Sequence, residues 1–516
     1  MNTDKTQSFL RVCLCSSVAL FGLLRGETGS EVCADCHREI FEAYQATSMA
    51  RSSGQVTGIE SEGAFTHKLS GVGYRVFRQA GAAWFSFDIA GVHGQRRLEY
   101  FVGSGSVGRS YLYTVGGFLY QAPVSWYSAP GKWDLSPGYR QYDRVYLTRG
   151  IETVCLECHA SRLQPAAGTS NGYRSPPFLE GGVSCERCHG PGDGHVAGRG
   201  KMINPARLAP DRRDSICAQC HLAGEARIAR AGAAGRFRPG DRLSDSLVVF
   251  EWSGNPDMNV TSHFETLAES ACKKASGDRL WCGSCHDPHR APAEAEKVRF
   301  YRAKCLQCHQ ADQCRRGPDC AGCHMPKRSV RDVQHSAYTD HAIRKAGAFM
   351  GASAGATKER KLVPFGGAAA GDREFGLAYA PVPGFEKRAL EFFERAPHDD
   401  AEVLAHLAYL YESNGNPSKA APLYQKALKL DPSQVAAAVN LGNLYIKSGQ
   451  AREAIELWRY ALEKSPGLET VRLSLAVALD RSGDSAAGDE ALRRLLELDP
   501  ANTAARKLLN EARSRR

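Results

Sequence analysis

The pentapeptide Cys-x-x-Cys-His occurs seven times in the first two thirds of this 516-residue chain. The copies occupy residues 33–37, 155–159, 185–189, 217–221, 282–286, 305–309 and 320–324. A chain with 18 cysteines and 16 histidines among 516 residues would contain on the order of 0.02 such pentapeptides by chance. The repetition therefore reflects one chemical role, and it constrains the fold more than any other feature.

This spacing is the attachment motif of c-type haem. The two thiols add to vinyl groups on one edge of the porphyrin, and the adjacent histidine becomes the proximal ligand of the iron. The predicted attachment residues are Cys33, Cys36, Cys155, Cys158, Cys185, Cys188, Cys217, Cys220, Cys282, Cys285, Cys305, Cys308, Cys320 and Cys323. The predicted proximal ligands are His37, His159, His189, His221, His286, His309 and His324. The sequence thus predicts seven covalently bound haem c groups, each with its iron.

Other uses of paired cysteines explain the pattern less well. A zinc site joins two Cys-x-x-Cys knuckles in one tetrahedral cage and needs no histidine after each, yet it is the main alternative. A thioredoxin-like motif occurs once, beside a βαβ pattern. Iron–sulfur clusters leave the trailing histidines unexplained.

Seven further histidines precede the C-terminal repeats, and they match the number of haems: His67, His93, His195, His263, His289, His335 and His341. Low-spin haems need a second strong axial ligand, so we predict these residues as distal ligands. Each has a simpler alternative role as a surface residue or as a hydrogen-bond partner of a propionate. Met49, shortly after the first motif, is the rival of His93.

His289 follows the motif histidine His286 by only three residues. It cannot reach the opposite face of the haem held by His286, so as a ligand it must serve a neighbouring haem. We expect that neighbour at the motif 217–221 or 305–309. The same argument applies to His195, six residues after His189, and it implies closely packed haems.

Residues 1–30 have the pattern of a secretory signal. Lys5 and Arg11 precede an apolar run of 13 residues, Val12 to Leu24, which is too short to span a bilayer comfortably. Haem is attached to such motifs after export, so we expect a periplasmic protein. No clear cleavage site follows the run, and an uncleaved N-terminus that associates with the membrane is the alternative.

The composition predicts three further parts. Residues 31–345 carry all seven motifs and should form short helices and loops around stacked haems. Short runs rich in β-branched and aromatic residues, at about 60–125, predict a small antiparallel β unit inserted there. Residues 346–385 are rich in glycine and alanine and are predicted to be a linker.

Residues 386–516 repeat with a period of 34, as shown by Gly415, Gly449 and Gly483. The pattern resembles the tetratricopeptide repeat and predicts an all-α solenoid. The copies span 401–433, 434–467 and 468–501, with a cap helix at 502–516, and Phe385–Pro397 is the second helix of a degenerate earlier copy. Such arrays present a concave surface to a protein or peptide partner, and the alternative role is structural packing on the cytochrome.

Several segments resemble periplasmic multihaem c-type cytochromes with doubled motifs, a group related to the tetrahaem electron acceptor of hydroxylamine oxidation. They include Tyr100-Phe-Val-Gly-Ser-Gly, Pro123-Val-Ser-Trp-Tyr, Cys188-His-Gly-Pro-Gly and Cys285-His-Asp-Pro-His. The resemblance implies electron transfer along bis-histidine haems to redox partner proteins. It favours an electron carrier over an enzyme. The alternative is a multihaem reductase or oxidase that acts on a small nitrogen or sulfur compound at one open haem.

The formal net charge of +10 belongs to the protein without its haems. Seven haems bring about 14 propionates and leave the holoprotein near neutrality, so nucleic acid is excluded as a partner. Four cysteines lie outside the motifs: Cys13 and Cys15 in the apolar run, and Cys272 and Cys314 near the later motifs. We expect Cys13 and Cys15 to be removed with the signal. In an oxidising compartment Cys272 and Cys314 form a disulfide or remain buried thiols.

Overall fold

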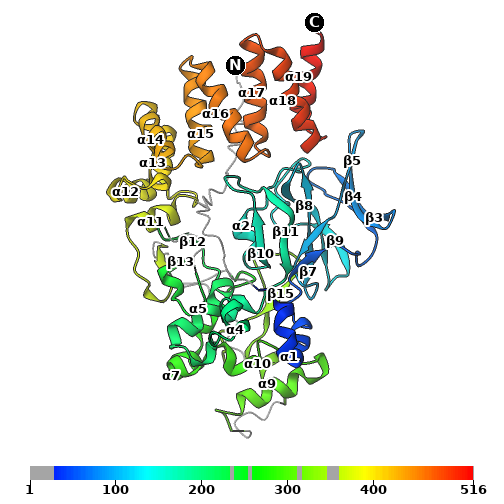
Figure 1. Ribbon diagram of the computed structural model, residues 1–516, viewed down its shortest axis with the longest axis vertical. Helices are drawn as coiled ribbons and strands as arrows, with labels where there is room; N and C mark the ends of the chain where they lie inside the picture. The colour runs from blue at the N-terminus through cyan, green and yellow to red at the C-terminus, as the bar shows by residue number, and fades with distance from the viewer. Residues whose placement is uncertain (1–27, 233–236, 254–257, 311–316, 346–359, 515–516) are drawn as a thin grey trace.

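The computed structural model describes residues 28–232, 237–253, 258–310, 317–345 and 360–514. Figure 1 shows three regions: motif-bearing short helices in the lower part, a β-rich unit on the right, and an arch of helices across the top. Within the described residues, no helix combines the length and apolar character needed to cross a membrane. The predicted signal, residues 1–30, lies almost wholly outside the described part.

Two antiparallel sheets form the β unit. Five strands, in the order β1-β6-β7-β8-β9, make one sheet: Ser53–Gln55, Tyr100–Val102, Gly108–Val115, Phe118–Tyr127 and Lys132–Leu135. Four strands, β2-β3-β4-β5, make the other: Gly63–Thr66, Gly73–Gln79, Ala82–Ile89 and Val92–Arg97. Alternating apolar residues from both sheets, such as Phe85, Tyr113 and Tyr120, share one buried core. The unit extends to Leu135, beyond the expected end near residue 125.

Short elements separated by loops carry the motifs. The helices are α1 (Ser30–Gln45), α2 (Thr153–Leu156), α3 (Glu186–His189), α4 (Asp193–Val196), α5 (Pro210–His221), α6 (His263–Glu269), α7 (Ala271–Ser276), α8 (Cys282–Cys285), α9 (Lys297–Cys305) and α10 (Cys320–His324). Small antiparallel pairs lie among them: β10 (Ala160–Pro165) with β11 (Tyr173–Gly181), and β14 (Lys327–Ser329) with β15 (Ala337–Thr339). These helices and strands are short and bury few apolar side chains of their own. This agrees with the expectation that bound macrocycles would complete the core of the region.

The C-terminal helices form antiparallel pairs with the predicted period. The pairs are α13 (Ala401–Ser413) with α14 (Pro417–Leu430), α15 (Val435–Lys447) with α16 (Ala451–Lys464), and α17 (Glu469–Arg481) with α18 (Ser485–Leu498), followed by α19 (Thr503–Ser514). Gly415, Gly449 and Gly483 join the helices of each pair at φ of 77°, 82° and 88°, which explains their spacing. Small residues such as Ala420 and Ala454 are fully buried where the helices cross.

The predicted linker is partly wrong. Residues 346–359 lie outside the described part, but β16 (Leu362–Pro364) pairs with β13 (Leu247–Trp252), which in turn pairs with β12 (Ala226–Ala229). Helix α11 (Asp372–Tyr379) then packs against α12 (Glu386–Arg395) as a helical pair that precedes the first full repeat. The second half of the segment is therefore folded, because Leu377 and Tyr379 enter a core with Phe393.

The repeat array contacts the rest of the protein at both ends. At the first end, Phe250 of β13 shares a buried core with residues of α11, α12 and α13. At the other end, Leu498 of α18 enters the core of the β unit. The carbonyl of Lys464 also accepts a hydrogen bond from Ser170 N at 3.0 Å. The array therefore packs structurally on the motif-bearing part of the chain and on the β unit.

Candidate haem sites

The motifs lie at the ends of helices and leave their thiols accessible. Cys36, Cys155, Cys308 and Cys323 are exposed, and the other described motif cysteines are half-buried. Aliphatic side chains next to the thiols also face solvent: Val32, Val154 and Leu306 are 37%, 42% and 38% exposed. Exposed aliphatic residues beside paired thiols suit an apolar macrocycle that would cover them. This arrangement fits the predicted haem attachment.

Two of the predicted distal histidines lie parallel to motif histidines. The ring centres of His37 and His195 are 6.4 Å apart with planes at 17°, and those of His189 and His289 are 5.8 Å apart at 12°. Two imidazoles that bind one metal ion from opposite sides have ring centres roughly 6 Å apart, because each metal–nitrogen bond is about 2.0 Å long. Both pairs therefore have the spacing that a shared iron requires.

The position of His289 corrects one expectation. It does lie against the histidine of a different motif, as predicted. That motif is 185–189, and not 217–221 or 305–309 as expected. The sequence argument assumed that the motifs adjoin in chain order, and the fold does not follow that order.

Four histidines form a second cluster. His263 lies between His221 and His341, with its ring centre 4.9 Å from each, and His341 lies 6.2 Å from His286. The cluster contains two motif histidines and two others, the ratio that two bis-histidine irons require. His286 and His341 already have a suitable spacing. His221 and His263 are closer together, with their Nδ1 atoms 3.3 Å apart.

Backbone carbonyls orient several of these rings. Nδ1 of His189 donates to the carbonyl of Ile203 at 2.8 Å, that of His195 to Gly200 at 3.0 Å, and that of His341 to Thr339 at 3.0 Å. A carbonyl can only accept, so the proton resides on Nδ1 and the lone pair on Nε2. His324 is held in the same way by the carbonyl of Arg344 at 2.7 Å. Nε2 is therefore free to bind a metal.

Burial keeps the clustered imidazoles neutral, which is the form that binds iron. It lowers the pKa of His263 to about 3 and that of His286 to about 4, and neighbouring histidines reinforce both shifts. Burial also lowers the pKa of His221, His341 and His289.

Three predicted distal ligands lie elsewhere. His67 bonds the hydroxyl of Ser70 through Nδ1 at 2.8 Å in the turn after β2. His93 lies on β5, is 73% exposed and pairs with Asp88. His335 approaches Asp134 of β9, with Nε2 2.6 Å from Oδ2.

The remaining motif histidines have different surroundings. His159 has a buried Nδ1 without a hydrogen-bond partner, and burial lowers its pKa. His309 follows α9, and His324 ends α10. Within the described residues, no second histidine ring lies against that of His159 or His324. Met49, the rival of His93, is half-buried, and its carbonyl accepts hydrogen bonds from Ser52 and Val183.

Neighbouring motifs contact each other directly. Arg187, inside the third motif, donates to the carbonyl of Glu157 in the second at 3.0 Å. Gln219, inside the fourth, donates to the carbonyl of Arg187 at 3.1 Å. Thiols of different motifs also lie close enough for one thiol to shift the pKa of the other, in the pairs Cys33–Cys185, Cys158–Cys220, Cys217–Cys282 and Cys305–Cys320. Sequence reasoning missed Arg187 and Gln219, because they occupy the variable positions of the motif and carry no signal of their own.

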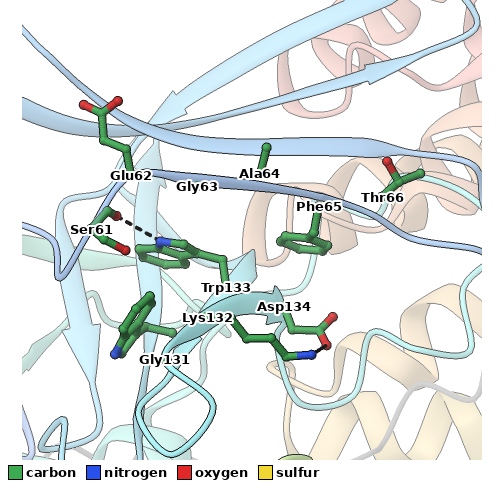
Figure 2. Close-up of a pocket in the computed structure, with 11 residues that line it drawn as sticks. Ser61, Glu62, Gly63, Ala64, Phe65, Thr66, Gly131, Lys132, Trp133 and Asp134 are labelled. Atoms are coloured by element: carbon green, nitrogen blue, oxygen red, sulfur yellow. Dashed lines mark hydrogen bonds and ion pairs between the residues drawn. The ribbon is translucent and has the colours of Figure 1, made fainter.

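Two other features lie outside this set. A pocket of about 410 Å³ on the β unit is lined by residues 61–66 of one sheet and by Trp126, Gly131, Lys132, Trp133 and Asp134 of the other (Figure 2). Trp133 donates to the carbonyl of Ser61 at 2.9 Å, so its indole is already bonded, and no motif residue lines the pocket. Cys272 is a free thiol on α7, and its suggested partner Cys314 lies outside the described residues.

Family models match two parts of the chain. Residues 140–190, which contain the second and third motifs, match the model of cytochrome c554 and c-prime. Residues 387–435 and 439–503 match a tetratricopeptide repeat model, and residues 412–459 match a second one.

Individual relatives are more distant. The multihaem cytochrome MtrA of Shewanella baltica (strain OS185) is 25% identical over 194 residues, which cover 34% of this chain and 56% of that protein. A structure of MamA (AMB-1) is 24% identical, with a TM-score of 0.26 over 28% of this chain and 80% of its own. YrrB, a repeat protein with an unusual peptide-binding site, is 20% identical, with a TM-score of 0.23 over 27% of this chain and 75% of its own. The chain therefore contains a cytochrome c segment, for which the matches imply covalently bound haem c, and a C-terminal array of tetratricopeptide repeats.

Proposed function

We propose that this protein is a periplasmic heptahaem c-type cytochrome that transfers electrons between partner proteins. The observation that carries the proposal is the pairing of motif and non-motif imidazoles, His37 with His195 and His189 with His289, at the spacing of two ligands on one iron. A bis-histidine iron has no open position, which suits electron transfer rather than substrate binding.

In this proposal, the motif thiols and the paired imidazoles have different roles. The motif thiols would hold the haem groups, and the paired imidazoles would supply the ligands of the iron. Haem supplies a one-electron iron couple that the protein side chains lack. The bonds from Nδ1 to backbone carbonyls fix the ring orientation and raise the basicity of Nε2. Contacts between motifs, such as Arg187 with Glu157, support close packing of the groups that the motifs hold.

The relation to doubled-motif cytochromes, including the group of the tetrahaem acceptor in hydroxylamine oxidation, is part of this proposal. It is supported by the family match at residues 140–190 and by the seven motifs. Export to the periplasm is supported by the pattern of residues 1–30 and by the attachment chemistry. The repeat array would dock a protein or peptide partner, since repeats of this type commonly present such a surface.

One observation favours a second function. Neither His159 of the second motif nor His324 of the seventh has a described histidine against its ring. Nδ1 of His324 bonds the carbonyl of Arg344, whereas Nδ1 of His159 is buried without a hydrogen-bond partner. A haem held by His159 alone would be open to a small ligand. The alternative is therefore a reductase or oxidase that acts on a small nitrogen or sulfur compound at this position.

Two measurements test the proposal. A pyridine haemochrome assay on purified protein should give seven c-type haems per chain, and a count of four or five would contradict it. Low-temperature EPR of the oxidised protein should be dominated by low-spin signals. A high-spin signal for one iron, together with carbon monoxide binding, would support the second function instead.

A further inference from the structure

The contact between the last repeat and the β unit contains two buried carboxylates. We call this contact the third-repeat interface, formed by residues 464–469 and 497–502 of the array against Arg96 and residues 144–149 of the β-unit side. Leu498 enters the β-unit core, and a Cβ on Gly467 would lie 2.8 Å from the carbonyl oxygen of Thr148. The side chains of Glu469 and Asp499 are only 7% and 1% exposed there.

The two carboxylates share one cation. Arg144 Nη1 lies 2.8 Å from Glu469 Oε2 and 3.7 Å from Asp499 Oδ2, and the arginine side chain is 41% exposed. Glu469 is further satisfied by the hydroxyl of Thr148 and by Asn502. Oδ1 of Asp499 accepts from Ala501 N at 3.0 Å, but Oδ2 is buried without a hydrogen-bond partner.

The other groups that face Asp499 offset its charge only in part. The guanidinium of Arg96 on β5 donates to the carbonyls of Glu497 and Leu498, and its charge lowers the pKa of Asp499 less than burial raises it. Tyr74 and Tyr113, from β3 and β7, are buried phenols with a raised pKa and stay neutral. An ionised Asp499 would therefore be a buried carboxylate with incomplete compensation, which is costly. Burial, reinforced by Glu469, accordingly raises the pKa of Asp499 to about 7.

We propose that a proton on Asp499, which lies beside Glu469, controls docking of the third repeat on the β unit, so that this end of the array loosens as the pH rises. The direction follows from linkage. A carboxyl whose pKa is higher in the docked state than in water binds its proton more tightly when docked. Docking is therefore most favourable in acid and weakens as the pH rises from about 4 to about 7. The first end of the array lacks this pair, although burial also raises the pKa of Glu402 there to about 7.

Hydrogen exchange on the haem-loaded full chain tests the proposal between pH 5 and pH 8.5, after correction for intrinsic exchange rates. In the natural protein, peptides that cover 144–150 and 464–470 should lose protection as the pH rises. Peptides that cover 435–447 of α15, a helix without acidic residues or histidine, should keep theirs. Asp499→Asn should keep the third-repeat interface protected throughout, because an amide carries no charge.

The chain offers a matched control. Asp431 follows α14 as Asp499 follows α18, and its Oδ1 accepts from Ser433 N at 2.9 Å in the same kind of turn. Asp431 does not face the β unit, so Asp431→Asn should retain the pH response of the natural protein. Should Asp499→Asn not fold, Glu469→Gln removes the other half of the pair and should also flatten the response.

Two outcomes would overturn the proposal. One is equal protection of the interface peptides at pH 5 and pH 8.5 in the natural protein. The other is an unchanged pH response in both Asp499→Asn and Glu469→Gln. Loss of protection over the whole array at high pH would mean global unfolding, and would equally count against local control by this pair. None of these results depends on whether the haem groups transfer electrons.

Discussion

The imidazole of His289 lies parallel to that of His189, although the two residues are 100 positions apart and belong to different motif segments. His289 follows the fifth motif, yet its ring faces the histidine of the third. The side chain that completes one site is thus supplied by the loop of another. The pair at the third motif therefore forms only when the segment that follows the fifth motif is in place.

His289→Ala should therefore affect the haem held by His189. Loss of one axial imidazole converts a low-spin bis-histidine iron into a high-spin iron that binds carbon monoxide. We expect one low-spin EPR signal to be replaced by a high-spin signal and one carbon monoxide to bind per chain. The exposed His93, changed to alanine, is the control and should leave the spectrum unaltered. An unchanged set of low-spin signals in His289→Ala would remove the best-supported axial pair.

His341→Ala tests the four-histidine cluster. The ring of His341 lies 6.2 Å from that of His286 and 4.9 Å from that of His263. If His341 serves the iron held by His286, the variant should gain one high-spin iron while all seven haems remain attached. The haemochrome count and the EPR spectrum check this together. A gain of two high-spin irons would mean that loss of His341 also displaces His263 from the second iron of the cluster.

Trp458→Ala should destabilise the repeat array. Trp458 is 2% exposed, and its indole donates to the carbonyl of Val439 at 3.3 Å. Truncation of a buried tryptophan costs about 3–5 kcal/mol through the cavity that it leaves. Urea denaturation followed by far-ultraviolet circular dichroism should show this loss, and the exposed neighbour Arg459, changed to alanine, should show less than about 0.5 kcal/mol. A difference below 1 kcal/mol between the two variants would contradict the assigned packing.

The stability of the first repeat should depend on pH through His406. This residue is 8% exposed and lies parallel to Phe393 with ring centres 5.6 Å apart. Burial lowers its pKa to about 4. In the unfolded chain His406 is protonated below about pH 6.5, whereas in the folded array it is protonated only below about pH 4. The free energy of unfolding therefore decreases as the pH falls between these values.

The full loss should be roughly 3 kcal/mol at pH 4. His406→Leu keeps the site apolar without a titrating group, and should remove most of this acid-side dependence. His398→Ala changes a histidine that bonds the carbonyl of Phe393 at 3.0 Å, and should leave the dependence in place. Parallel denaturation curves at pH 7 and pH 4.5 compare the three proteins.

Local patterns predicted most of the array and the attachment chemistry. The 34-residue period placed the helices of three repeats within a few residues, because each repeat is held by contacts to its immediate neighbours. The motif spacing predicted covalently bound haem c, because attachment needs only residues within one pentapeptide. The cytochrome match at residues 140–190 supports this prediction. Strand β5 lies inside the predicted β unit but lacks its apolar pattern, because Val92–Arg97 is mostly polar and is held by hydrogen bonds to β4.

Long-range contacts could not be predicted. Helix α11 lies in a glycine- and alanine-rich segment, and it folds because distant residues such as Phe250 complete its core. His335 looked equivalent to His341 in the sequence, but its backbone adopts a φ of 56° and its ring meets Asp134, 201 residues away. A count of histidines gives the number of possible ligands. The fold decides which of them meet.

The attachment of the repeat array at both ends also limits its length. One end shares a core with β13, and the other inserts Leu498 into the β unit, so the array bridges two fixed points on the cytochrome region (Figure 1). Each 34-residue unit adds a set translation and rotation to such a solenoid. Insertion or deletion of a single unit would therefore misplace one anchor, even if the added helices were individually sound. In a repeat protein that is free at one end, the number of repeats can change during evolution. Here the distance between the two attachment points fixes that number.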